Sequence, residues 1–121
     1  MEEVAESNVS GEIVIGLPVP EDLSKAIVYV RLEDTSLADA PSRVVSEQRL
    51  MRLPERLTST GTVPFNLHAR WTDPKSTYSV SVHVDVDRDG KVSTGDYINT
   101  ESYPVLTFGH TGRASIRVQQ V

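Results

Sequence analysis

The chain has 121 residues, of which 24% are charged and 38% hydrophobic, and its formal net charge at pH 7 is -5. This length fits a single domain with one core, and the acidic balance argues against nucleic acid as a partner. The absence of cysteine excludes disulfides, thiolate zinc sites and cysteine nucleophiles. The sequence contains no stretch of about 20 apolar residues, so we expect no direct membrane insertion.

The first third of the chain begins without a pattern and then predicts strands. Residues 1–9 show no periodicity and are expected to form a disordered tail, with a β-sandwich domain over residues 10–121. Residues 11–16 (GEIVIG) predict a first strand, and a proline-containing connector with room for one helical turn follows it. Residues 26–33 alternate and predict a second strand. Its expected core-facing residues are Val28, Val30 and Leu32.

One segment in the middle of the chain is ambiguous. The apolar positions of residues 43–53 fit both a helical and a strand period, and we favour a strand. Residues 62–70 alternate clearly, and Pro64 within them predicts an edge strand or the beginning of a strand. The side chains expected to point inward here are those of Val63, Phe65, Leu67 and Ala69.

The last third of the chain predicts three more strands. These cover residues 77–84, residues 97–107 with an interruption at Pro104, and residues 113–121. Short alternating runs separated by turn-forming residues are typical of an antiparallel sandwich. The predicted fold class is therefore all-β, a single-domain antiparallel β-sandwich of the immunoglobulin-like type with about seven strands.

Residues 85–96 read DVDRDGKVSTGD and fit the template of a calcium-binding loop, with acids at positions 1, 3, 5 and 12 and glycine at position 6. A hard divalent cation takes six to eight oxygen ligands, so a single loop must alternate carboxylates and turn sharply, which Gly90 permits. We expect a structural calcium ion (Ca2+) that orders the loop. The expected ligands are Asp85, Asp87, Asp89, Lys91 through its carbonyl oxygen, Ser93 through its hydroxyl or a bridging water, and Asp96.

This loop departs from the helical version of the motif in two ways. Asp96 closes the loop where a glutamate is usual, and a strand precedes it. In this respect the twelve residues resemble the calcium loops of dockerins and other secreted modules. Val92, at position 8, is expected to turn inward and anchor the loop. The alternative is that Asp89 and Gly90 form a plain hairpin turn while the other acids are solvated.

The sequence offers little for catalysis. His68, His83 and His110 are expected on outward faces of strands or in a loop, so we interpret them as surface residues, with His83 as a possible neighbour of the cation site. The sequence contains no Gly-x-Ser-x-Gly elbow. We therefore expect no enzyme activity, and a hydrolase with a triad assembled from separate loops is the least favoured alternative.

Four segments carry a wider resemblance: LEDTSLADAP at residues 32–41, VPF at 63–65, YSV at 78–80 and YPVLT at 103–107. They resemble the YbaY/YscW-like family of bacterial lipoprotein domains, which includes type III secretion pilotins, and the likeness spans most of the chain. The resemblance implies a small β-sandwich with no known catalytic centre, usually anchored to a bacterial membrane by a lipidated cysteine. In the pilotin branch it implies a role in helping an outer-membrane secretin to assemble.

The chain differs from that family by having no cysteine and by carrying the acidic loop in place of a short hairpin. The sequence favours a non-enzymatic, calcium-binding accessory or binding domain, with a pilotin-like secretion chaperone as the alternative. A pilotin should expose an apolar patch or an open strand edge to a protein partner, and residues 43–53 are the place to look for it. The calcium loop and the resemblance favour a periplasmic or extracellular location, although the acidic N-terminus lacks the pattern of a signal peptide.

Overall fold

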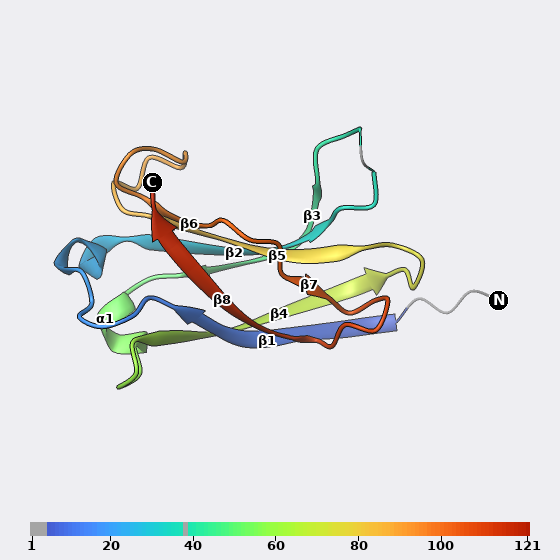
Figure 1. The fold of residues 1–121 in the computed structure, drawn as a ribbon, viewed down its shortest axis with the longest axis horizontal. Helices are drawn as coiled ribbons and strands as arrows, with labels where there is room; N and C mark the ends of the chain where they lie inside the picture. The colour runs from blue at the N-terminus through green and yellow to red at the C-terminus, as the bar shows by residue number, and fades with distance from the viewer. Residues whose placement is uncertain (1–4, 38) are drawn as a thin grey trace.

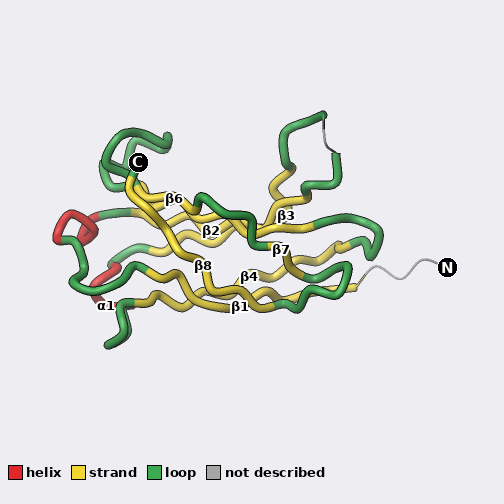
Figure 2. The backbone as a smooth tube through the Cα atoms, viewed as in Figure 1, coloured by secondary structure: helices red, strands yellow, loops and turns green. Residues whose placement is uncertain are grey.

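The computed structural model describes residues 5–37 and 39–121, and Figure 1 traces their path. Strands dominate these residues, and the helical segments are short turns, as Figure 2 shows. The elements in chain order are β1 (Ala5–Val14), η1 (Glu21–Lys25), β2 (Ile27–Asp34), β3 (Arg43–Leu50), α1 (Leu53–Arg56), β4 (Thr62–Thr72), β5 (Tyr78–Asp85), β6 (Tyr97–Asn99), β7 (Pro104–Val105) and β8 (Arg113–Gln120).

Alternating side chains explain why these segments form strands around one core. Every second residue is buried over residues 28–32 of β2 and 63–69 of β4, which is the period of a strand with one face on the core and one face towards solvent. The core residues predicted from this pattern in the two strands are all confirmed as buried. The inner faces of β5 and β8 complete the core, with residues such as Val80, Val84 and Ile116 fully buried.

The strands form one mixed sheet in the order β3-β2-β5-β6-β8-β1-β4, and β7 pairs with β5. All neighbours are antiparallel except β1 and β8, which run parallel. Figure 1 shows β8 crossing from the layer of β1 and β4 to the layer of β6. Its first half pairs with β1 through Ser10 to Val14, and its end pairs with β6. One strand therefore joins the two layers.

A close backbone approach accompanies the parallel pairing of β1 and β8. A Cβ atom placed on Gly11 would overlap the carbonyl oxygen of Ala114 on β8. Glycine has no side chain and leaves this space free. The backbones of β1 and β8 can therefore approach more closely than they could with any other residue at position 11.

Side chains link the two ends of the sheet. The Ser46 hydroxyl on β3 donates to the His68 carbonyl oxygen on β4 at 2.8 Å, and the Asn66 amide on β4 donates to Oε1 of Gln48 at 3.0 Å. These side-chain bridges bring β3 and β4 together, although the two strands form no backbone ladder with each other in the described sheet. The sheet is therefore a nearly closed barrel.

This architecture corrects the prediction in part. The all-β class is confirmed, whereas one rolled mixed sheet of eight strands takes the place of the predicted immunoglobulin-like pair of antiparallel sheets with about seven strands. The extra strand arises because residues 97–107 form two short strands, β6 and β7, on either side of a loop. Residues 43–53 are strand up to Leu50, as favoured, and then enter the helical turn of α1.

The N-terminal strand is longer than expected. β1 begins at Ala5, so residues 5–9, which the sequence placed in the tail, lie in a strand that pairs with β4. The physical reason is that Val9 is completely buried and Asn8 lies opposite His68, contacts that a pattern of mixed polar residues does not reveal. Residues 1–4 lie outside the described part of the chain. Within the described residues, the structure contains no helix long and apolar enough to cross a membrane.

Candidate functional site

Two features of the described surface combine charge with defined geometry, and both lie at the end of the barrel that also carries α1 and η1 (Figure 1). The first is the acidic loop, residues 85–96, which connects β5 to β6. β5 ends at Asp85 and β6 begins directly after Asp96, so the strands fix the first and last acids of the loop. Asp85 is 0% exposed and Asp96 is 1% exposed, while Asp87 and Asp89 lie at the surface.

Backbone amides inside the loop hold the carboxylates in place. The Gly90 amide donates to Oδ2 of Asp85 at 2.8 Å, and the Val86 amide donates to Oδ1 of Asp96 at 3.0 Å. Gly90 has φ of +80°, in the left-handed region that favours glycine, so the reversal predicted at this position is present. The loop is also tied to the C-terminus, because the Val121 amide donates to the Asp96 carbonyl oxygen at 2.8 Å.

One oxygen in the loop has no such donor. Oδ1 of Asp85 is buried and has no hydrogen-bond partner among the described residues. Burial raises the pKa of the Asp85 carboxyl, and the neighbouring Asp87 and Asp96 carboxylates raise it further. A buried carboxylate in this position is costly unless a proton or a cation meets it.

The carboxylate of Asp96 is better satisfied. Nε2 of His83 donates to its Oδ2 at 2.7 Å, and the Ser93 amide donates to the same oxygen at 3.2 Å. Burial acts to raise the pKa of Asp96, but the hydrogen bonds from His83, Val86 and Ser93 outweigh it and hold the pKa below its usual value. Asp96 is therefore a carboxylate that keeps its negative charge inside the protein.

The structure corrects the prediction that His83 is a surface residue. His83 is 6% exposed, and its ring stacks on that of Tyr29 with centroids 5.8 Å apart. Both faces of the end of β5 are covered, so the alternation of side chains no longer separates buried residues from exposed ones there. The expectation that it neighbours the loop agrees with its hydrogen bond to Asp96.

Four of the six predicted ligands come together. Single oxygens of Asp85, Asp87, Asp89 and Asp96 all lie within 4.8 Å of one another, and His83, Asp85 and Asp96 form a second, overlapping group. Ser93 lies beside them and donates its hydroxyl to Oδ2 of Asp87 at 3.1 Å, whereas the exposed Lys91 donates its amide to Asp89. This buried and partly exposed cluster could hold a metal ion.

The prediction that Val92 anchors the loop is wrong. Its side chain is 55% exposed. In the helical motif this position packs against other parts of the protein, but here the loop projects from the end of the barrel (Figure 1).

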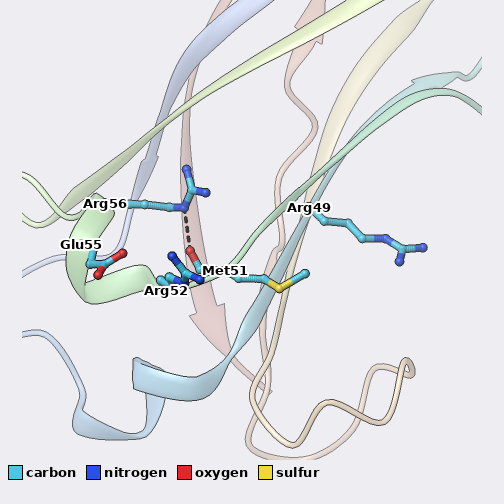
Figure 3. Close-up of a pocket in the computed structure, with 5 residues that line it drawn as sticks. All are labelled: Arg49, Met51, Arg52, Glu55 and Arg56. Carbon is cyan, nitrogen blue, oxygen red and sulfur yellow. Dashed lines mark hydrogen bonds between the residues drawn. The ribbon is translucent and has the colours of Figure 1, made fainter.

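The second feature is a basic pocket at the end of β3, which Figure 3 shows in close-up. It has a volume of about 460 Å³ and is lined by Arg49, Met51, Arg52, Glu55 and Arg56. Nε of Arg56 donates to the Met51 carbonyl oxygen at 2.6 Å, which connects α1 to the segment after β3. Arg52 has φ of +57°, and this left-handed residue turns the chain from β3 into α1.

The pocket combines positive charge with an exposed apolar side chain. Three arginines and a single glutamate line it, although the chain as a whole is acidic. Met51 is 46% exposed within this setting. Sequence reasoning singled out residues 43–53, which include Arg49 and Arg52, for a partner surface but missed Arg56 of α1. The signal was the spacing of Arg49, Arg52 and Arg56, which places basic residues three and four apart in an acidic chain.

Comparison with known proteins adds independent information. Residues 4–118 match a family described as type III secretion system lipoprotein chaperone, YscW. Among curated proteins, nothing matches the sequence. Among solved structures, the chain is similar to an alternative pilotin from the type II secretion system of Vibrio cholerae, with 27% sequence identity and a TM-score of 0.71. That similarity covers 97% of this chain and 98% of the pilotin chain.

Proposed function

The chain belongs to the YscW family of type III secretion system lipoprotein chaperones, and from this premise we propose that it is a pilotin-like chaperone that assists the assembly of a secretion system. The observation that carries the proposal is the family match over residues 4–118. The similarity to a type II pilotin over nearly the full length of both chains supports it. The role is a binding role without a chemical reaction.

The sequence alone favoured a calcium-binding accessory domain and offered the pilotin-like chaperone as the alternative. The chaperone is now the favoured function. The resemblance predicted from the LEDTSLADAP segment is confirmed by the family match. A calcium-binding loop, which the sequence alone favoured, is a feature of the fold and does not specify a biological function. The comparisons support the chaperone role and leave the cation as a separate question.

We place the partner at the basic pocket. Its lining residues are Arg49 near the end of β3 and four residues that follow this strand. β3 lies at one end of the strand order and is held to β4 by side chains. The partner that fits is a protein segment with acidic residues for Arg49, Arg52 and Arg56 and an apolar side chain for Met51. Arginine and methionine are both enriched at protein interfaces, because each offers a large contact area.

The family description also bears on location. A lipoprotein chaperone of a secretion system works at the bacterial envelope, so we propose that this chain acts on its periplasmic side. The 121 residues contain no cysteine to which a lipid could be attached. The proposal therefore concerns the compartment, and the means of attachment is not part of it.

The test of function uses the secretin of the same bacterium. Deleting the gene for this protein should reduce the amount of assembled secretin in the outer membrane, and restoring the full chain should recover it. The measurement is the fraction of secretin that migrates as a multimer in extracts of the outer membrane. Unchanged secretin assembly in the deletion strain would show that the chain is not its chaperone.

The test of the site uses two variants with matched controls. Met51→Asp and Arg52→Asn should weaken binding to overlapping secretin peptides by about tenfold each in calorimetric titration. Asparagine tolerates the left-handed backbone at position 52, so this variant removes charge without new strain. The controls are Leu37→Asp and Arg113→Asn, which make the same changes at exposed positions outside the pocket. Equal binding by variants and controls would place the partner elsewhere.

A further inference from the structure

The acidic loop concentrates negative charge that the protein itself does not neutralise. Oxygens of four carboxylates lie within 4.8 Å of one another, and two of the four residues are buried. Like charges at such distances repel strongly where water is excluded. The basic residues within the loop are Arg88 and Lys91, and both side chains are exposed. An arrangement of this kind is stable when a positive ion occupies its centre.

The orphaned oxygen of Asp85 is the second and independent observation. The Asp85 side chain is completely buried, its Oδ2 accepts the Gly90 amide, and its Oδ1 has no partner within the described chain. Buried polar atoms are nearly always satisfied, so an exception calls for a specific explanation such as a bound ion. Asp85 belongs to the cluster of carboxylates, and the hydrogen bond from the Gly90 amide to its Oδ2 fixes the orientation of its side chain.

The donor set selects the type of ion. Among the described residues, His83 is the only side chain grouped with these acids that could bind a metal through nitrogen. Its Nε2 already forms a hydrogen bond of 2.7 Å with Oδ2 of Asp96. The histidine thus positions a carboxylate and leaves an all-oxygen set facing the centre of the loop. Oxygen ligands on a flexible loop favour Ca2+ over Mg2+, which demands a strict octahedron, and over metals that prefer nitrogen.

We propose that Asp85, Asp87, Asp89 and Asp96 bind one Ca2+ ion, which fixes the connection between β5 and β6. The Lys91 carbonyl oxygen and the Ser93 hydroxyl supply further oxygen ligands. The plain hairpin considered as an alternative needs only Asp89 and Gly90, and it gives no reason for a buried Asp85 whose Oδ1 has no hydrogen-bond partner among the described residues. The site is separate from the proposed chaperone function and does not depend on it.

The experiment is a calorimetric titration of the full chain, stripped with a chelator, with CaCl2, MgCl2 and ZnCl2 in turn. Melting curves are taken in parallel. The expected result is saturable binding of one Ca2+ per chain with a raised melting temperature, because an ion bound only by the folded state stabilises it. Mg2+ should bind more weakly. The absence of both calcium heat and a thermal shift, or binding of Zn2+ without Ca2+, would overturn the proposal.

Two variants separate ion binding from folding. Asp85→Asn keeps the acceptor for Gly90 and removes a buried charge, so its melting temperature in chelator should equal or exceed that of the wild type. It should nevertheless lose the calcium-dependent rise. Asp89→Asn, at an exposed position, should weaken Ca2+ binding by about tenfold or more.

The matched control is Asp39→Asn, which makes the same change at an exposed aspartate outside the loop and should bind Ca2+ like the wild type. A calcium response that persists unchanged in both Asp85→Asn and Asp89→Asn would refute the site. The secretin assembly assay is independent of this titration. Failure of one proposal is therefore distinguishable from failure of the other.

Discussion

Among single residues, Glu47 on β3 makes the densest set of charged contacts outside the acidic loop. It accepts hydrogen bonds from Nε of Arg31 at 2.7 Å and Nε of Arg49 at 3.1 Å. Both guanidinium groups lie over the Tyr29 ring, at 5.0 Å and 5.4 Å from its centroid. Because Arg49 also lines the basic pocket, Glu47 fixes one wall of the proposed partner site.

We expect this cluster to make stability depend on pH. The hydrogen bond from Arg31 outweighs burial and, with that from Arg49, holds the pKa of Glu47 below its ordinary value of 4.5. A lowered pKa contributes stability above pH 4.5, and this contribution is lost as the pH falls through the folded-state pKa. Glu47→Gln should therefore lower the free energy of unfolding at neutral pH by about 1 kcal/mol or less, and the difference from wild type should vanish in acid.

Urea unfolding of both proteins across the pH range measures this difference. The control, Glu101→Gln, removes an exposed carboxylate outside the cluster and should show no comparable dependence on pH. If the difference in the free energy of unfolding between wild type and Glu47→Gln stayed constant down to strongly acidic pH, Glu47 would not be the source of the pH dependence.

Individual residues also show how far sequence reasoning reached into the site. The spacing of the acids predicted the cluster of Asp85, Asp87, Asp89 and Asp96, because ligands within one loop are fixed by local geometry. The burial of His83 and the exposure of Val92 were not predictable in this way. Both depend on which other elements cover the end of the barrel, and that is a property of the tertiary fold.

At the scale of the element, the contact between β1 and β8 depends on the missing side chain of Gly11. Gly11→Ala should lower the free energy of unfolding by about 2 kcal/mol, because the added methyl group overlaps the Ala114 carbonyl oxygen and the backbones must separate. Thermal or urea unfolding checks the magnitude. The control is Ser115→Ala, at an exposed position of the same strand pair. Equal stability of the two variants would mean that the strands tolerate a wider spacing.

The side-chain bridges between β3 and β4 give a second prediction at this scale. Gln48→Ala should leave the Asn66 amide without its acceptor and lower the free energy of unfolding by about 1 kcal/mol. Hydrogen exchange at Asn66 should become faster than in the wild type. Exchange at Leu67, which pairs with β1 on the other side of β4, serves as the internal control. Unchanged exchange at Asn66 would show that the bridge does not close the barrel.

The elements themselves were largely predictable, and their arrangement was not. Alternation located the core faces of β2 and β4, since that pattern is local. The parallel pairing of β1 with β8 joins residues up to 103 positions apart, and no local pattern encodes it. The same pairing explains why one continuous sheet replaces the predicted sandwich of two.

At the scale of the whole molecule, a basic pocket lies on a protein with a net charge of -5. The pocket attracts an acidic partner segment, and the rest of the surface repels it. Because salt screens charges, both the attraction and the repulsion weaken as the ionic strength rises. We expect the affinity for secretin peptides to fall between about 0.05 M and about 0.5 M salt if the short-range pairs with arginine dominate.

Stopped-flow or calorimetric measurements at several ionic strengths test this expectation. Arg52→Asn should show a shallower dependence on salt than the wild type, because one of the charges that salt screens has been removed. The Arg113→Asn control should keep the wild-type slope. Affinity that rises with salt would indicate that repulsion by the acidic remainder of the surface outweighs the pairs with arginine.

The pairing of the first strand with the last also affects how the protein is made. A ribosome releases β1 about 100 residues before β8, and contacts between residues so distant in the chain form slowly. The nascent chain can pair β1 with β4 earlier, but the two layers cannot be joined until residues 113–120 have emerged. Residues 113–117 therefore determine when residues 10–14 reach their final structure.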